Sequence, residues 1–168
     1  MKQIQTPISD AVIQDLKVGD RITISGYIFT GRDAVLPKLV SLAEAGSLAE
    51  NGINLIGGVI FHTAVSPAGV GPTSSNKLEI EGSIPALSKA GIKLHLGKGA
   101  LKPETVAALD RHGSVYAVIP PVTALLESKI VSRRVAAFPE EGMEALHILE
   151  IDGFPAIIAA AHGESIYL

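Results

Sequence analysis

The sequence predicts an α/β fold with a largely parallel central sheet. Short apolar runs rich in β-branched residues alternate with segments whose apolar residues recur at helical spacing, over most of the 168 residues. Turn-forming residues separate these segments, as they do in chains built from βα units. Closely spaced strands near the C-terminal end indicate some antiparallel pairing. No repeat or linker interrupts the pattern, so we expect a single domain, residues 1–168.

The first third of the chain predicts a helix, a strand and a second helix. Ser9 is placed to cap a short helix, with Ile8 and Ile13 as a hydrophobic staple. Residues 21–29 alternate in polarity and are rich in β-branched residues, which predicts a strand. After Asp33, apolar residues recur at helical spacing, namely Val35, Leu36, Leu39, Val40 and Ala43.

The middle of the chain predicts a strand, a loop, a helix and a strand. Residues 55–62 are an apolar run with two glycines, which is typical of a buried strand. Residues 63–72 are rich in glycine, proline and small residues, which predicts a loop. Residues 83–90 then favour a short helix, and residues 92–96 favour a strand.

The last third begins with a helix over residues 103–112, because Pro103 stands in its first turn and Gly113 follows its end. The remaining pattern predicts a strand at 114–119, a helix at 122–129, a strand at 131–138, and two strands at 146–151 and 156–161. Asp152-Gly153-Phe154-Pro155 is expected to form the turn between the last two strands.

The composition suggests an oligomeric protein. Hydrophobic residues make up 47% of the chain and charged residues only 18%. No apolar run approaches the roughly 18–20 residues that a membrane span needs, so we expect no membrane partner. Large apolar patches are unusual on monomers. The apolar surplus therefore indicates an interface with another subunit, in a hetero-oligomer or a homo-oligomer.

Several function classes are excluded or disfavoured. The net charge of -3 argues against a nucleic-acid partner, which would require a basic face. The sequence contains no cysteine, so this chain can supply neither disulfides nor thiolate ligands for zinc or an iron–sulfur cluster. No long apolar segment follows Met1, so we expect no secretory signal and a cytoplasmic location.

Three short motifs combine a cation or a hydroxyl with predicted strand ends and helix starts. They are Thr30-Gly31-Arg32-Asp33, Gly71-Pro72-Thr73-Ser74-Ser75-Asn76-Lys77 and Gly97-Lys98-Gly99. In α/β sheets, ligands bind at the carboxyl ends of the strands. Helix N-termini and nearby cations favour carboxylates or phosphates there. The motifs therefore predict one half of an anion-binding active site.

Each motif also has a purely structural interpretation. Arg32 could be a surface arginine balanced by Asp33, and Thr73 could simply cap the following segment. Lys77 could be a solvated lysine near two glutamates. Lys98 is harder to explain in this way, because its flanking glycines let backbone and ammonium both approach a ligand.

Other familiar sites do not fit the sequence. Lys98 does not belong to a phosphate-binding P-loop, because Gly91 is one residue too far away and Gly99 stands where Ser or Thr would bind magnesium. The five histidines lack paired ligand spacing, which favours structural roles over a metal site. Among them, only His62 lies near the motif loops.

Taken together, the motifs resemble the β subunit, or C-terminal domain, of the class I iron–sulfur hydro-lyases, fumarate hydratase and L-tartrate dehydratase. The resemblance covers nearly the whole chain. Besides the three motifs it includes Thr6-Pro7-Ile8-Ser9, Val18-Gly19-Asp20, Ser25-Gly26, Ala124-Leu125-Leu126 and Asp152-Gly153-Phe154-Pro155-Ala156.

The resemblance implies a swivelling β/β/α three-layer domain that pairs with an α subunit carrying a cysteine-ligated [4Fe–4S] cluster. It also implies a small dicarboxylate substrate. By position, Arg32 and Lys77 match arginines of the family motifs, and Arg32 would bind a substrate carboxylate. Thr73 matches the threonine proposed as the base, and Lys98 matches the lysine that completes the carboxylate cage.

The sequence departs from the family pattern at three places. Lys77 replaces an arginine, Lys102 replaces a serine, and Pro120-Pro121 replaces a glycine pair. Lysine keeps the charge of arginine but loses its bidentate fork.

From the resemblance, the leading hypothesis is the β subunit of a fumarate hydratase that interconverts fumarate and (S)-malate. The alternatives are a dehydratase of L-tartrate or another hydroxy-dicarboxylate, and a non-catalytic anion-binding paralogue.

Overall fold

In the computed structural model, residues 1–66, 69–73, 77–120 and 123–167 are described, with side chains included except at residues 66, 69–73, 77–80, 123 and 124. The strands are β1 (Lys2–Gln5), β2 (Arg21–Thr30), β3 (Val59–Phe61), β4 (Thr63–Ser66), β5 (Gly69–Thr73), β6 (Leu94–Gly97), β7 (Val115–Val118), β8 (Ile130–Ala137), β9 (Leu146–Ala161) and β10 (Glu164–Ser165). The helices are α1 (Asp10–Asp15), α2 (Leu36–Glu44), α3 (Lys77–Lys89), α4 (Pro103–Arg111) and α5 (Thr123–Glu127), with 3₁₀ turns η1 (Ala49–Asn51) and η2 (Pro139–Glu144).

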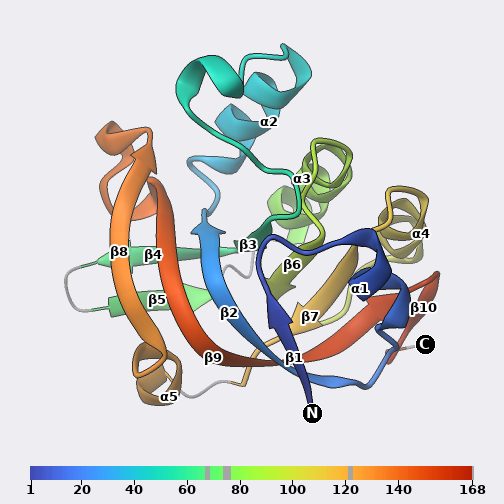
Figure 1. Ribbon diagram of the computed structural model, residues 1–168. Helices are drawn as coiled ribbons and strands as arrows, with labels where there is room; N and C mark the ends of the chain where they lie inside the picture. Colours follow the sequence, from blue (N-terminus) through green and yellow to red (C-terminus); the bar gives the residue numbers. More distant parts are fainter. Residues whose placement is uncertain (67–68, 74–76, 121–122, 168) are drawn as a thin grey trace.

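A barrel-like ring of strands organises the fold (Figure 1). The order around the ring is β2-β3-β6-β7-β9, and β9 closes it by pairing with β2 as well as with β7. Ile157 of β9 lies opposite Arg21 of β2 and also opposite Val118 of β7. β1 extends the sheet beside β2, and β8 extends it beside β9.

The sheet is mixed. Among the described strands of this sheet, four pairings are parallel and four, all made by β9, are antiparallel. The prediction of an α/β fold is confirmed, and the parallel part of the sheet is the run β1-β2-β3-β6-β7. The antiparallel part is larger than the sequence suggested, because β9 pairs in antiparallel fashion with both β2 and β7, the two strands between which it closes the ring. The swivelling three-layer arrangement stays a prediction.

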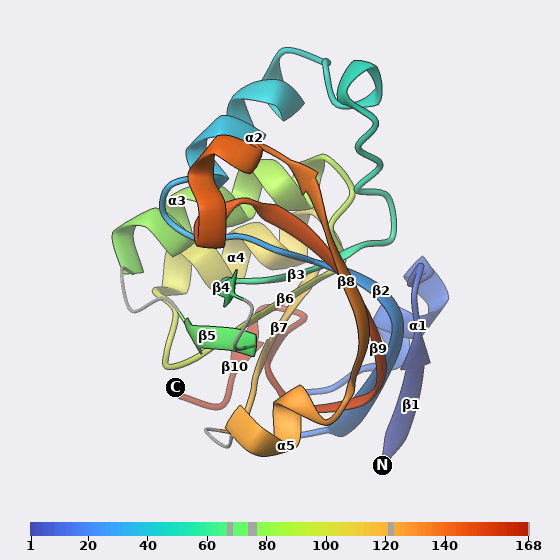
Figure 2. The same cartoon turned by 90° about the vertical axis from the view of Figure 1, so that its left-hand side faces the viewer.

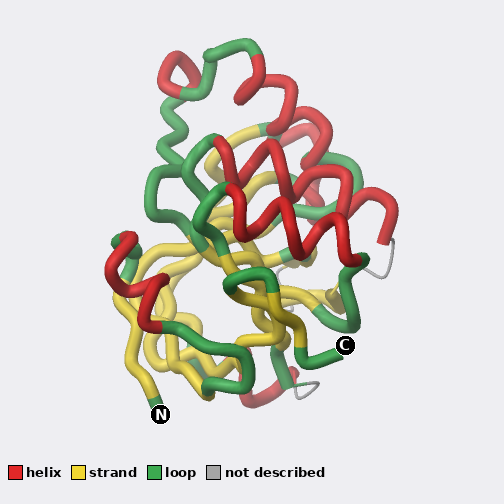
Figure 3. The backbone as a smooth tube through the Cα atoms, turned by 90° about the vertical axis from the view of Figure 1, so that its right-hand side faces the viewer, coloured by secondary structure: helices red, strands yellow, loops and turns green. Residues whose placement is uncertain are grey.

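The apolar core has an inner and an outer part. Inside the ring, apolar side chains of β2, β3, β6 and β9 form one cluster that includes Ile24, Phe61, Leu96 and Phe154. Outside it, α2, α3 and α4 lie in sequence over one side of the strands (Figure 3). Leu87 of α3 packs there in a second cluster. Among the described residues, no helix has the length and apolar character needed to cross a membrane.

Several predicted elements are confirmed. α1 begins after Ser9, whose hydroxyl accepts a hydrogen bond from the backbone N–H of Val12 at 3.3 Å. The predicted strand at 21–29 is β2, and the helix predicted after Asp33 is α2. The helix predicted at 103–112 is α4, and Gly113 after it has a φ of 67°.

The prediction of a loop over residues 63–72 is wrong. The segment forms a hairpin of β4 and β5, in which Thr63 lies opposite Thr73. Glycine and proline lowered the local strand signal, but antiparallel pairing across the hairpin supplies the missing hydrogen bonds. The helix that follows, α3, begins at Lys77, earlier than the predicted residue 83.

The prediction of a turn at residues 152–155 is also wrong. β9 runs without interruption through Asp152-Gly153-Phe154-Pro155. Gly153 adopts a φ of 69°, which is the left-handed region that favours glycine, and the strand continues past it. Phe154 is completely buried, and its ring meets that of Phe61 edge to face with centroids 5.7 Å apart.

The sequence did not predict β1. This strand pairs in parallel with β2, and Ile4 is its one buried residue among Lys2–Gln5. A four-residue segment with a single buried side chain carries too little periodicity to signal a strand. Its pairing with a strand sixteen residues away supplies the stabilisation.

The burial of Phe154 predicts a large loss of stability on truncation. Phe154→Ala should lower the free energy of unfolding by about 3–5 kcal/mol, because it removes a buried ring and leaves a cavity. Urea denaturation followed by circular dichroism measures this, with Tyr27→Ala as the control because Tyr27 is 61% exposed. Equal losses in both variants would contradict the placement of Phe154 in the core.

Candidate functional site

The candidate site lies at the carboxyl edge of three neighbouring parallel strands. Thr30 of β2 lies in register with Phe61 of β3, and Phe61 lies in register with Leu96 of β6. The ladder continues past these residues, since Gly31 N donates to Phe61 O at 3.0 Å and His62 N donates to Leu96 O at 3.1 Å. The segments that follow the three strands therefore leave the sheet at one level.

This register brings the predicted site residues to one edge. Arg32, Thr63 and Lys98 each stand two residues after a member of the row Thr30, Phe61 and Leu96. Neighbouring strands lie about 4.8 Å apart, so the Arg32 and Lys98 backbones leave the sheet about 10 Å from each other. Thr73 joins them, because its backbone lies opposite Thr63 in the hairpin.

The first motif contains two buried polar groups without partners. The Thr30 hydroxyl and the Arg32 Nε are both buried and have no hydrogen-bond partner among the described residues. Thr30 is completely buried and the Arg32 side chain is half-buried. A buried donor without an acceptor costs about 1–3 kcal/mol, so a ligand oxygen placed here would relieve that cost.

Backbone contacts fix the loop between β2 and α2. α2 starts at Leu36, and its cap residue Val35 makes no side-chain hydrogen bond. Instead Glu144 of η2 accepts a hydrogen bond from Ala34 N at 3.1 Å. Gly31 is needed for packing, since a Cβ there would lie 2.9 Å from Val35 Cγ1.

The loop that carries Lys98 is held at both ends. Tyr116 donates from its hydroxyl to Gly99 O at 3.1 Å, and Lys102 N donates to Glu81 Oε1 at 2.6 Å. Burial raises the pKa of the Tyr116 hydroxyl, so Tyr116 remains a donor at neutral pH. Lys98 itself is exposed on this fixed loop.

The glycines beside Lys98 have structural reasons that the sequence did not reveal. A Cβ on Gly97 would lie 3.1 Å from the Tyr116 hydroxyl, so Gly97 leaves room for that ring. Gly99 has a φ of 75°, which favours glycine. Tyr116, Glu81 and Glu144 are supporting residues that sequence reasoning missed, because their partners are distant in the sequence and no local pattern links them.

The second motif is placed by its backbone. Thr73 is the last residue of β5 and Lys77 is the first residue of α3. The motif therefore runs from the end of the hairpin to the N-terminus of the helix. Ser74, Ser75 and Asn76 lie outside the described residues. A helix N-terminus at this edge favours an anion nearby, in agreement with the charge of the other two motifs.

A buried polar chain lies beneath the edge. His62 Nε2 and His95 Nδ1 are 3.4 Å apart, and His95 Nε2 lies 2.8 Å from the Ser88 hydroxyl. Burial holds the pKa of His95 well below its usual range, and the neighbouring His62 lowers it further. These three polar side chains connect the end of β3 with β6 and α3, since His62 directly follows β3, His95 is in β6 and Ser88 is in α3. β6 precedes Lys98, and α3 begins with Lys77.

His147 lies at the other side of Thr30. It is directly opposite Thr30 in the antiparallel pairing of β2 with β9, and its Nδ1 is 2.9 Å from Ala145 O. Burial lowers the pKa of His147 and the charge of Arg133 lowers it further, although the hydrogen bond to Ala145 opposes both. His147 is therefore a neutral side chain at pH 7.

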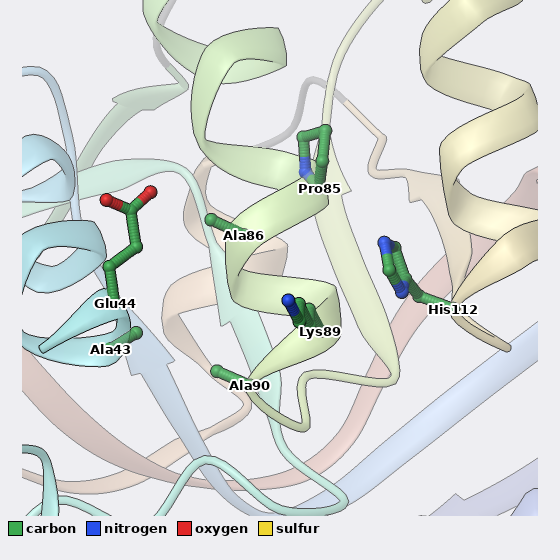
Figure 4. A pocket seen from close by; sticks show the side chains of 7 residues that line it. All are labelled: Ala43, Glu44, Pro85, Ala86, Lys89, Ala90 and His112. Atoms are coloured by element: carbon green, nitrogen blue, oxygen red, sulfur yellow. The ribbon is translucent and has the colours of Figure 1, made fainter. Parts of the chain in front are cut away.

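A cavity of about 580 Å³ at the opposite edge is a poor anion site (Figure 4). Glu44, Lys89 and His112 line it, from the C-terminal ends of α2, α3 and α4. Helix C-termini present carbonyl groups and a negative dipole end, which disfavour anions. The geometry therefore favours the carboxyl edge as the functional site.

Comparison with known proteins gives one family. The model of the fumarase C-terminus matches residues 2–168. The chain is 29% identical over 155 residues to the anaerobic class I fumarate hydratase of Escherichia coli K12, and the match covers 88% of this chain but 28% of that protein. The aerobic class I fumarate hydratase of Salmonella typhimurium is 26% identical, covering 92% of this chain and 28% of that protein.

A separate subunit also matches. The L(+)-tartrate dehydratase subunit beta of Escherichia coli K12 is 27% identical over 179 residues, and the match covers 98% of this chain and 86% of that subunit. The chain thus spans less than a third of these class I fumarate hydratases but most of this β subunit.

The lowered pKa of His95 predicts a loss of stability in acid. The unfolded chain takes up a proton near pH 6.5 that the folded chain does not, so stability falls as pH drops below that value, by up to about 1.4 kcal/mol per pH unit for each such histidine. Urea unfolding between pH 7.5 and 5.5 measures the slope. His95→Leu should make the slope of stability against pH shallower. The control Leu87→Ala, which truncates a buried apolar side chain of α3, should lower stability without changing that slope. An unchanged slope in His95→Leu would contradict the neutral buried state.

Proposed function

The chain belongs to the fumarase C-terminus family, and we propose that it is the β subunit of a class I hydro-lyase that interconverts fumarate and (S)-malate. The observation that carries the proposal is the shared edge at which Arg32, Thr73 and Lys98 emerge. The match over 86% of a separate L(+)-tartrate dehydratase β subunit supports a partner α subunit that completes the enzyme.

The charge at this edge suits the reaction. Removing the proton next to a carboxylate builds up negative charge on that carboxylate, and fixed cations aimed at such charge are a large catalytic term. Arg32 would bind a substrate carboxylate through its guanidinium, whose buried Nε has no hydrogen-bond partner in the described part of the chain. Lys98 would complete the carboxylate cage from the fixed loop after β6.

A [4Fe–4S] cluster fits this chain only as the partner's group. The sequence has no cysteine, and its contribution to the edge is cations and hydroxyls. When bound to the α subunit, such a cluster supplies a Lewis acid that assists departure of the substrate hydroxyl. The β subunit would position the carboxylates in the shared site.

Thr73 would remove the carbon-bound proton. A threonine hydroxyl is a weak base at neutral pH, so this role needs activation within the assembled site. The N-terminus of α3, which begins four residues later, would stabilise the alkoxide form. The closed position of the domain over the partner, reached by a swivelling motion, would bring the hydroxyl to the substrate.

A dehydratase of L-tartrate is the second candidate. Lys77 bears on the choice of dicarboxylate, since a lysine in place of the family arginine keeps the charge but presents a single ammonium instead of a fork. The match to a tartrate dehydratase β subunit over 86% of that subunit supports this candidate.

Anaerobic co-expression with a cysteine-bearing α subunit tests the proposal. The expected result is a brown complex that consumes fumarate, measured by loss of its ultraviolet absorbance. Turnover of L-tartrate to oxaloacetate instead would support the second candidate. A complex inactive with every hydroxy-dicarboxylate would support a non-catalytic anion-binding paralogue.

Removal of either cation should impair the assembled enzyme strongly. Arg32→Ala and Lys98→Ala should each raise the activation free energy in kcat/KM by about 2–5 kcal/mol, because each leaves a substrate carboxylate unpaired in the closed site. Arg21→Ala is the matched control, since Arg21 is exposed at the opposite end of β2. Near-normal turnover in either test variant would remove that residue from the site.

Exchange at residue 77 should report the substrate. Lys77→Arg should retain or increase kcat/KM for fumarate, because arginine restores the bidentate contact with a carboxylate. Parallel assays with fumarate and L-tartrate measure the ratio of the two values. A selective loss of fumarate turnover would show that the site is adapted to a different dicarboxylate.

A further inference from the structure

A strand edge and an open cavity adjoin the candidate site. β8 pairs with β9 and, within the described part of the sheet, with no other strand (Figure 2). Residues 131–135 of β8 are all exposed, and Val131 is 63% exposed. An exposed edge with apolar side chains presents free N–H and C=O groups and is a ready pairing site for another chain.

The cavity beside this edge has an apolar wall and a basic rim. It has a volume of about 480 Å³, and Val65, Val135 and Met143 line it together with Arg133 and Arg134. Val135 is 46% exposed and Met143 is 54% exposed, which is unusual for apolar side chains that face one cavity.

One row of paired residues links the cavity to the candidate site. His147 lines it and is 8% exposed. His147 lies opposite Val135 on one side and opposite Thr30 on the other, so β8, β9 and β2 share one row. Any subunit that brings a cluster to Arg32 would therefore approach this surface as well.

The charge on β8 selects between two kinds of partner. With the two-fold axis between Arg133 and Arg134, at the middle of the exposed segment, antiparallel pairing with a second copy of β8 would set each arginine opposite an arginine of the other copy. Like charges directly opposite each other destabilise a strand pair. Arg133 Nη1 already lies 3.7 Å from Glu127 Oε1. β8 itself contains two arginines and no acidic residue, so an acidic partner would instead be attracted.

We infer that the β8 edge and its cavity are the docking surface for the α subunit, which inserts an apolar side chain flanked by a carboxylate. The apolar wall takes the side chain and Arg134 takes the carboxylate, beside the pair of Arg133 with Glu127. This inference rests on the proposed function for the existence of the α subunit. The inference adds to that function the surface at which the two subunits meet.

Matched charge and apolar variants test the surface. Met143→Glu and Arg134→Glu should each raise the Kd between the purified chain and the α subunit at least about ten-fold, measured by biolayer interferometry under anaerobic conditions. Ile56→Glu and Arg21→Glu are the controls. Ile56 is 74% exposed and Arg21 is exposed, and both lie at the amino ends of the parallel strands.

The outcomes separate the surface from the reaction. Normal α-subunit affinity in both test variants would overturn the inference, as would a wild-type chain that does not bind the α subunit. A self-associated chain that Arg134→Glu dissociates, measured by light scattering, would also overturn it in favour of a second copy. Selective loss of affinity in a complex that turns over no dicarboxylate would uphold the surface and contradict the proposed reaction.

Discussion

The pairing of β9 with both β2 and β7 is the interaction on which the rest of the structure depends. It closes the strands into a ring, so the parallel strands β2, β3, β6 and β7 cannot slide relative to one another without breaking two antiparallel ladders. The closure also buries the inner cluster of apolar side chains from several directions at once. A fixed register then places the ends of β2, β3 and β6 at one level.

That register is the basis on which a chain with few charges would build the proposed anion site. Each of the three segments carries one cation or hydroxyl to the edge, and a separate contact holds each segment: Glu144 for the first, the hairpin pairing for the second, and Tyr116 with Glu81 for the third. Charged groups on fixed loops need no reorganisation when a carboxylate arrives, which is the physical basis of electrostatic catalysis.

The sequence predicted those elements whose signal is local. β2 alternates in polarity and α4 carries its own start and stop residues, so both were found. The β4–β5 hairpin and the passage of β9 through Gly153 were mispredicted, because glycine and proline signalled turns while distant pairing decided the conformation. The motifs that contain Arg32 and Lys98 follow the carboxyl ends of β2 and β6, as predicted. The roles of Gly97 and Gly99 depend on Tyr116 and on local φ, which the sequence pattern does not contain.

The most direct test of a shared, cation-lined site is the position of a bound dicarboxylate in an anaerobic crystal structure of the complex with the α subunit. A substrate carboxylate should lie about 3 Å from the Arg32 guanidinium and from the Lys98 ammonium, beyond the carboxyl ends of β2 and β6. A dicarboxylate bound at the partner's cluster with neither side chain in contact would contradict this placement.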